Sequence, residues 1–179
     1  MIYSASSAVT FTSTSSVYQC LTSAYSTAII DPELLAQTST MGGAFYIKNA
    51  VKFTSTSNTI EYCYVGDTGG AFTIESSTLV DTTSTYLNNA AVTGGAIACK
   101  SCFSLSVTQS TFTNHEAYNG GLIYLDSPQT GVILDSVTVT TATAKNNGGL
   151  VYAVGLSSSP TFTLTVKNTA VGTVTWTNL

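Results

Sequence analysis

The amino-acid sequence predicts an all-β fold, a right-handed parallel β-helix whose coils are about 26 residues long and hold three short strands each. Three observations predict it. Gly-Gly pairs recur at nearly regular intervals, apolar residues line up in columns after each pair, and the composition favours strands over helices. We expect residues 1–179 to form a single β-helix domain, which is either complete or a segment of a longer solenoid.

Gly-Gly pairs divide the sequence at intervals of 27, 25, 26 and 28 residues. The pairs are Gly42-Gly43, Gly69-Gly70, Gly94-Gly95, Gly120-Gly121 and Gly148-Gly149. A repeat of about 20 to 50 residues is typical of solenoids. We interpret each pair as a corner of the coil, where the chain needs a positive φ or a close approach of two backbones. A phosphate-binding loop is disfavoured, because no pair leads into the Gly-Lys-Ser/Thr ending of such loops.

Each Gly-Gly pair precedes a predicted strand with one buried side, because apolar residues stand three and five positions after the first Gly. The first apolar column is Phe45, Phe72, Ile97, Ile123 and Val151. The second is Ile47, Ile74, Cys99, Leu125 and Ala153. Between them runs an outward column of Tyr46, Thr73, Ala98, Tyr124 and Tyr152. We expect the coils to stack so that each column forms a vertical row.

Two further strands per coil follow from the same alternation. The second strand is predicted from Val51/Phe53, Leu79, Phe103/Leu105/Val107, Val132/Leu134 and Phe162/Leu164/Val166. The third is predicted from Ile60/Tyr62, Tyr86, Phe112, Val137/Val139 and Val174/Trp176. A single coil buries too few side chains to offset the entropy of ordering its backbone, so it must share its core with neighbouring coils.

Less regular segments are assigned to the ends and the turns. Val17-Tyr18-Gln19-Cys20 fits a degenerate coil that places Cys20 in the column of Ile47 and Cys99. Turn-rich insertions are expected after the first strand at 126–131 and 155–160, protruding on one side of the solenoid. The segment 31–35 is either a loop or a short helix starting at Pro32.

Composition excludes several classes of function. Charged residues make up 8% of the chain and all five basic residues are Lys, whereas a nucleic-acid binder needs clustered cations. No apolar run approaches the ~18 residues of a membrane span. The 55 Ser and Thr residues are accompanied by 44% apolar residues, which disfavours disorder. Residues 1–4 lack the pattern of a signal peptide, so the peptide was removed, or the chain is a fragment, or the protein is cytosolic.

The stretch from Ser110 to Ile123 resembles the repeat of polymorphic outer-membrane proteins, in which a Phe-and-Asn motif precedes a Gly-Gly-Ala-Ile motif. The second half of that motif is matched by Gly42-Gly43-Ala44-Phe45, Gly69-Gly70-Ala71-Phe72 and Gly94-Gly95-Ala96-Ile97. The first half departs from the family, because one residue separates Phe112 from Asn114 where the family has two. The resemblance covers about residues 40–155 and implies a pectin-lyase-like β-helix with an extracellular or cell-surface role in adhesion or surface architecture.

We therefore expect a non-enzymatic structural or adhesive protein that acts as a β-helical rod or filament unit. Its expected partners are further copies or flanking coils of a longer chain, stacked end to end, and surface glycans, with no nucleic acid and no membrane span. A carbohydrate-binding module is the alternative, and a polysaccharide lyase or hydrolase of the β-helix fold is a third reading. Lyases of this fold use Arg as a base, and the chain has none. Its acidic residues are too thinly spread for the carboxylate pair of a glycosidase.

Few residues carry chemistry that could define a site, and we expect no cofactor, no metal and no catalytic residue. Tyr46, Tyr124 and Tyr152 are candidates for stacking on sugar rings, with cross-strand stacking as the structural alternative. Cys99 and Cys102 form either a local disulfide, or two free or buried thiols, or a redox or zinc site. We expect His115 to lie exposed in a turn. A surface ion pair between Glu75 and Lys100 is also expected.

Overall fold

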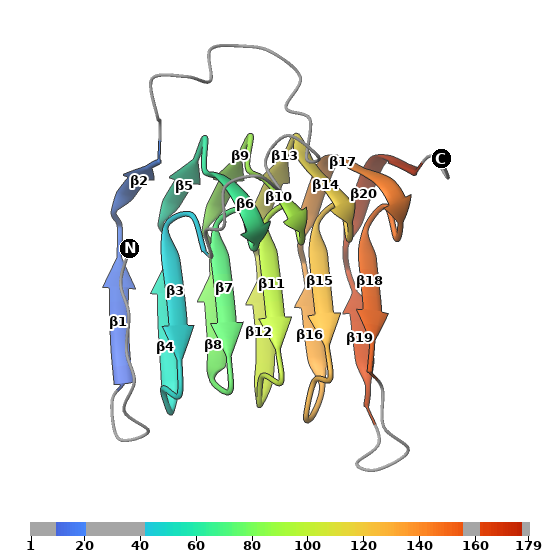
Figure 1. Cartoon of the computed structure of the whole chain (residues 1–179). Coiled ribbons are helices and arrows are strands. Elements are labelled where there is room, and N and C mark those ends of the chain that lie inside the picture. Colours follow the sequence, from blue (N-terminus) through green and yellow to red (C-terminus); the bar gives the residue numbers. More distant parts are fainter. Residues whose placement is uncertain (1–9, 21–41, 156–161, 177–179) are drawn as a thin grey trace.

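Parallel strands stacked coil upon coil make up the part of the chain that the structure describes. The structure is a computed structural model, and it describes residues 10–20, 42–155 and 162–176. Within these ranges the strands pair in parallel and no helix occurs (Figure 1). The predicted β-solenoid is confirmed. Its three sheets run along the long axis, and each coil contributes to every sheet in turn.

Sheet A holds the strands that follow the Gly-Gly pairs: β3 (Phe45–Lys48), β7 (Phe72–Glu75), β11 (Ile97–Lys100), β15 (Ile123–Asp126) and β18 (Val151–Val154). Sheet B holds β1 (Thr10–Thr14), β4 (Lys52–Thr56), β8 (Thr78–Thr82), β12 (Ser104–Thr108), β16 (Val132–Asp135) and β19 (Leu164–Lys167). The third side, sheet C, begins with β2 (Val17–Gln19), β5 (Thr59–Glu61), β9 (Thr85–Leu87) and β13 (Thr111–Thr113).

Sheet C is bent, and its second half was not predicted. In three coils a further strand stands before the next Gly-Gly pair: β6 (Tyr64–Thr68), β10 (Ala90–Thr93) and β14 (His115–Asn119). In the coil that begins with β15, one strand, β17 (Thr138–Asn147), spans both halves and pairs with β20 (Ala170–Trp176). The coil therefore has three sides, but four strands where the third side bends.

Single residues with positive φ end the strands and turn the chain at each corner. The first Gly of each pair has this conformation before sheet A, with φ between +57° and +69°. Elsewhere Ser, Asn or Thr often fills the same role, for example Asn49 between β3 and β4 and Asn88 in the bend of sheet C. Asn and Ser are suited to such turns because their short side chains bond locally to the backbone.

The second Gly of each pair is needed for a different reason, which is close approach between coils. A Cβ on Gly95 would overlap the carbonyl oxygen of Gly121 in the next coil and would lie 2.9 Å from the carbonyl oxygen of Glu116. The backbones are held this close by hydrogen bonds such as Gly95 N–H to Gly120 O at 3.1 Å. Both predicted reasons for a Gly-Gly corner are confirmed.

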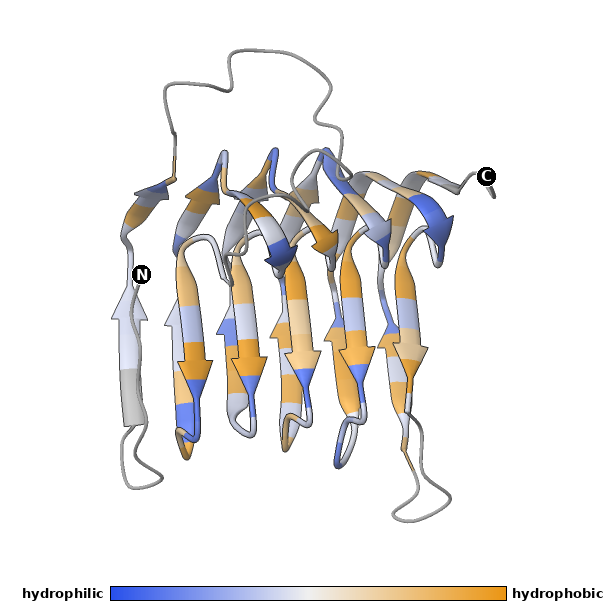
Figure 2. Cartoon of the chain, in the orientation of Figure 1, coloured by the Kyte–Doolittle hydropathy of each residue, from blue (hydrophilic) through white to orange (hydrophobic). Residues whose placement is uncertain are grey.

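The core consists of apolar columns that run through the middle of the solenoid (Figure 2). Strand register places the first predicted column, Phe45, Phe72, Ile97, Ile123 and Val151, in one row. Within it the rings of Phe45 and Phe72 stack at 4.8 Å, and in sheet C those of Tyr86 and Phe112 stack at 4.4 Å. Each such side chain contributes about 1.5–3 kcal/mol when fully buried.

Several residues lie elsewhere than their columns predicted. Val51 and Phe103 were placed in the second strand, but they stand in the turns before β4 and β12 and are 54% and 49% exposed. Val174 pairs with Ala142 in the second half of sheet C, so Val171 continues the row of Phe112 and Val139 instead. Each misplacement follows from reading apolar residues without knowing where the strand begins.

The N-terminal segment was also placed in the wrong sheet. The prediction put Cys20 in the column of Ile47 and Cys99, yet β2 pairs with β5 in sheet C, so Cys20 stands beside Tyr62 at a corner. Of the predicted insertion at 126–131, Asp126 ends β15 and residues 127–131 form the turn from β15 to β16. The predicted loop or helix at 31–35 and the insertion after Gly155 lie outside the described residues.

Candidate functional site

The outward column of sheet A brings two of the three candidate tyrosines together. Tyr124 and Tyr152 are in register on β15 and β18, their ring centroids are 6.0 Å apart, and both are partly exposed. Burial, together with the charge of Asp126 and the neighbouring Tyr152, raises the pKa of Tyr124. The pair presents two phenol rings tilted by 42° on the flat side of the solenoid.

Tyr46 is not part of this pair. Thr73 and Ala98 stand between it and Tyr124 in the same column. Its hydroxyl donates to the Glu75 carboxylate at 2.6 Å, which ties the ring to the end of the neighbouring strand β7. The structure therefore divides the predicted aromatic surface into a pair, Tyr124 and Tyr152, and a separate residue with a structural bond.

Charges alternate along the neighbouring column of sheet A. Register places Lys48, Glu75, Lys100 and Asp126 one above the other, each next to an opposite charge. The ion pair of Glu75 is made with Lys48, at 2.6 Å, and not with Lys100 as predicted. Burial raises the pKa of Glu75, but bonds from Lys48 and Tyr46 and the charges of Lys48 and Lys100 lower it on balance. This alternation of charges disfavours a shift in register between neighbouring coils.

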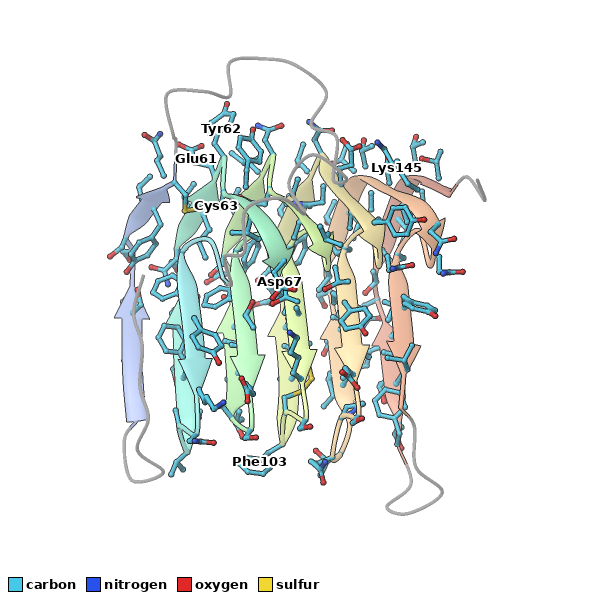
Figure 3. All side chains as sticks on the ribbon, viewed as in Figure 1. Glu61, Tyr62, Cys63, Asp67, Phe103 and Lys145 are labelled. Carbon is cyan, nitrogen blue, oxygen red and sulfur yellow. A yellow bond between two sulfur atoms is a disulfide. The ribbon has the colours of Figure 1, made fainter. Side chains whose placement is uncertain are left out.

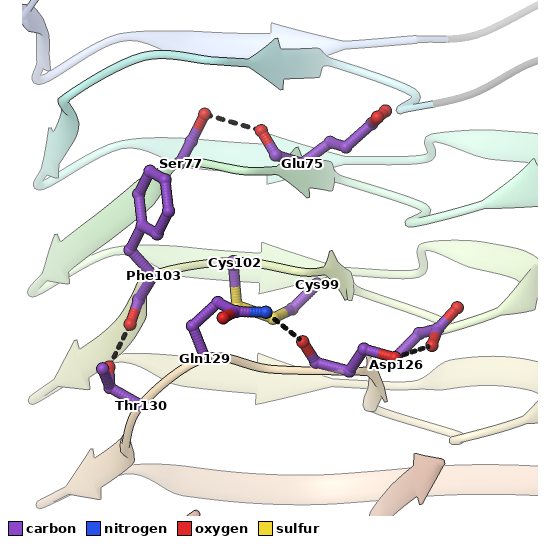
Figure 4. Close-up of a disulfide and its surroundings, with 9 residues drawn as sticks. Glu75, Ser77, Cys99, Cys102, Phe103, Asp126, Gln129 and Thr130 are labelled. Atoms are coloured by element: carbon purple, nitrogen blue, oxygen red, sulfur yellow. Dashed lines mark hydrogen bonds between the residues drawn. A yellow bond between two sulfur atoms is a disulfide. The ribbon is translucent and has the colours of Figure 1, made fainter. Parts of the chain in front are cut away.

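The four cysteines form two disulfides (Figures 3 and 4). Cys99 and Cys102 close a short loop at the corner between sheets A and B, and both are buried. The Gln129 backbone N–H of the next coil donates to the Cys102 carbonyl at 2.9 Å. Cys20 and Cys63 join the first described coil to the bend of sheet C in the second. Of the three alternatives for Cys99 and Cys102, this arrangement is the local disulfide.

A buried polar cluster inside the solenoid is absent from the sequence predictions. Asp81 points inward from β8 and is fully buried, and Ser110 donates to its carboxylate at 2.7 Å. The hydroxyls of Ser84 and Ser110 also accept backbone N–H groups from the coil before, at 3.2 Å from Asn58 and 3.1 Å from Ser84. These serines therefore cap the corner between sheets B and C.

Asp81 itself is incompletely satisfied in this cluster. One of its carboxylate oxygens and the buried hydroxyl of Tyr86 both lack a hydrogen bond in the structure. Burial raises the pKa of Asp81, and the nearby hydroxyls, that of Ser110 among them, only partly oppose this shift. A buried carboxyl without a cation beside it is more stable in the neutral form. Asp81, Ser84 and Ser110 are all buried, so a substrate could not reach the cluster, and we assign it to the core.

His115 is buried and not in an exposed turn, which corrects the prediction. It begins β14, packs edge-on against Phe112 at 5.7 Å, and neither ring nitrogen makes a hydrogen bond. Burial lowers its pKa to about 4, although the backbone of Asn89 and Tyr86 favours the charged form. The prediction was wrong because a strand follows directly on the positive-φ residue Asn114.

The remaining charged residues do not gather into a reaction centre within the described ranges. Figure 3 shows Glu61, Asp67 and Lys145 on separate parts of the solenoid. Among the described residues no group of three or more His, Cys, Asp or Glu could hold a metal ion. In the same residues no helix is long and apolar enough to cross a membrane.

Comparison with known proteins finds no matching family model, no similar curated protein and no similar solved structure.

Proposed function

We propose that the chain is a non-enzymatic structural or adhesive protein of the cell exterior, which acts as a β-helical rod or filament unit. The observation that carries this proposal is the end of the solenoid. In the last described coil Leu164, Val166 and Val171 are 42%, 46% and 46% exposed. Each is in register with a buried residue of the coil before it, namely Val132, Leu134 and Val139.

The exposed end of the last described coil resembles the surfaces that are buried between neighbouring coils. Its side chains point along inward columns, and the backbone groups of β19 and β20 that face away from the solenoid are free of ladder partners among the described residues. An exposed strand edge beside apolar side chains favours pairing with another strand. The proposed occupant is a further coil, supplied either by a second copy or by a longer chain.

Two features support placement outside the cell. The disulfides Cys20–Cys63 and Cys99–Cys102 are typical of oxidising compartments. The resemblance of the Gly-Gly-Ala repeats to polymorphic outer-membrane proteins implies a surface role, and it stays a prediction. An extracellular rod with few charges and two disulfides is suited to carry mechanical load or to display a binding surface.

Assembly through the exposed end is tested by electron microscopy and light scattering of the whole chain across a range of concentrations. We expect rods longer than one solenoid. Val166→Lys places a charge in the end surface and should abolish them, whereas Val51→Lys, in an exposed turn away from the end, should not. A chain that stays monomeric at every concentration, or rods that survive Val166→Lys, would refute end-to-end assembly.

Carbohydrate binding is the second candidate, and the paired rings of Tyr124 and Tyr152 favour it. Partly exposed aromatic rings on a flat sheet offer stacking area for sugar rings at little cost in side-chain entropy. A glycan array with the whole chain tests it. We expect that Tyr124→Ala and Tyr152→Ala each abolish binding and that Tyr46→Ala retains it. Release of cleaved products from a polysaccharide would contradict both candidates and favour the enzyme reading.

A further inference from the structure

The outer side of sheet B is an ordered array of hydroxyl groups. One column on it is Thr14, Thr56, Thr82 and Thr108, in register on β1, β4, β8 and β12. The neighbouring column, two residues earlier in each strand, is Thr12, Thr54, Val80 and Ser106. Seven of these eight positions therefore carry a hydroxyl. We call these two columns the hydroxyl face.

Strand geometry makes the array periodic in two directions. Successive coils repeat about every 4.8 Å along the solenoid axis, and outward residues two apart repeat about every 6.7 Å along a strand. Thr is β-branched and stiff at χ1, so its hydroxyl and methyl groups are held in place before any partner binds. The face is thus pre-organised, and binding costs little side-chain entropy.

The hydroxyls of this face are available to a partner. Those of Thr56, Thr82 and Thr108 make no hydrogen bond to the protein among the described residues, whereas the adjacent Thr83 hydroxyl lies 2.9 Å from that of Ser57. Sheet C carries one threonine column, Thr59, Thr85, Thr111 and Thr138, but the column two residues later in each strand holds Glu61 and Leu87. The equivalent outward positions of sheet A carry Tyr46, Tyr124 and alternating charges instead.

The charge and the side-chain types of the hydroxyl face indicate which kind of surface it binds. From β1 to β12 the two columns contain no charged residue, so this part of the side complements an uncharged surface; Lys52 borders it at the start of β4, and Asp135, which is paired with Lys167, ends it on β16. The two columns also contain no aromatic ring, which disfavours sugars, because protein sites that bind sugars commonly stack aromatic faces on the sugar rings. An uncharged, rigid lattice of hydrogen-bond donors and acceptors with repeats of similar size is the surface of ice.

We propose that the hydroxyl face adsorbs to ice crystals through the ordered hydroxyl and methyl groups of its threonines. This property is independent of end-to-end assembly, since the face lies along the side of the solenoid and not at its end (Figure 1). The Val166→Lys variant, in which we expect no end-to-end assembly, should therefore retain it.

The test measures inhibition of ice recrystallisation, and thermal hysteresis of single ice crystals, with the whole chain. Thr82→Lys and Thr56→Lys place a charge in the centre of the face. Thr140→Lys is the matched control, because Thr140 is an exposed threonine on β17 in sheet C. Thermal unfolding of each variant checks the fold. We expect the effective concentration to rise about tenfold for Thr82→Lys, equivalent to roughly 1.4 kcal/mol of adsorption energy, and to stay unchanged for Thr140→Lys.

Three results would overturn the proposal. The first is a wild-type chain that is inactive in both ice assays. The second is an equal loss in folded Thr82→Lys and Thr140→Lys, which would mean that the face is not the binding surface. The third is binding to crystalline cellulose or chitin that Thr82→Lys abolishes while ice activity is unaffected, which would assign the face to a polysaccharide.

Discussion

Substitution of the second glycine in a Gly-Gly pair tests the physical basis of the coil stacking. In Gly95→Ala the new Cβ overlaps the Gly121 carbonyl oxygen and lies 2.9 Å and 3.0 Å from backbone atoms of Glu116. All of these atoms belong to backbone that cannot rotate away, so the coils must separate locally. That movement strains the bonds of Gly95 N–H to Gly120 O and of Ala96 N–H to Leu122 O.

The expected cost combines two terms. Overpacking in a tight core costs about 1–3 kcal/mol, and each weakened backbone bond costs about 1 kcal/mol. Gly95→Ala should therefore lower the free energy of unfolding by about 3–5 kcal/mol, or the Tm by roughly 10 °C for a chain of this length. Chemical and thermal denaturation, followed by circular dichroism, measure both quantities.

Gly131→Ala is the matched control. A Cβ there would have its nearest neighbour, the Thr163 carbonyl oxygen, at 3.3 Å, and Gly131 does not have a positive φ. We expect a clearly smaller loss, of about 1 kcal/mol at most, because the Thr163 carbonyl oxygen has to move by only a few tenths of an ångström. Equal stability of Gly95→Ala and the wild type would refute the close approach of the coils, since an added methyl group would then have room.

Three further predictions concern the core and the disulfides. The folded pKa of His115 is about 4, below its usual 6.5, so the folded state binds its proton less readily than the unfolded state. The contribution of His115 to the free energy of unfolding is therefore complete above pH 6.5 and is lost as the pH falls toward 4. We expect a loss of about 3 kcal/mol, measured by urea unfolding across that pH range. His115→Asn should remove this pH dependence and fold normally, because Asn89, one coil earlier, bonds the Cys63 N–H and the Ile60 carbonyl from the equivalent position. Replacing Cys20 and Cys63 by Ala should lower the free energy of unfolding by about 4 kcal/mol, and replacing Cys99 and Cys102 should lower it by about 2 kcal/mol. The first loss is larger because the first disulfide closes a loop of 43 residues and the second a loop of 3. The opposite order in thermal unfolding would contradict the loop-entropy account.

The sequence predicted those parts of the fold in which every coil repeats a strong local signal. Gly-Gly pairs give the period, and bulky alternating residues such as Phe72 and Leu79 give strands in sheets A and B. The second half of sheet C has no such signal, because its inward residues are small: Val65, Ala91 and Ala117 occupy one row. Small inward residues let the bend of sheet C approach the rest of the coil. They also leave these strands without the alternation of bulky apolar residues by which a strand is predicted from sequence.

The candidate surfaces were predictable to the extent that they depend on register alone. Tyr124 and Tyr152 are neighbours because both stand four residues after the first Gly of a pair. Whether Tyr46 joins them depends on its bond to Glu75, which side-chain geometry decides. Asp81 could have been found, since it follows the inward Leu79 by two positions, and alternation places it in the core.

Asp81 and His115 give the core opposite responses to pH. The folded pKa of Asp81 is raised, so its contribution to stability is fully present below the unfolded value of 3.8 and is lost as the pH rises through the folded value. Asp81→Asn keeps an acceptor for the Ser110 hydroxyl and removes the charge. This variant should be more stable than the wild type at pH 7, and its loss of stability in acid should be steeper, because only the His115 effect remains. If Asp81→Asn is destabilised at pH 7, the carboxylate has a partner that compensates its burial, and the neutral form is not the one that the core favours.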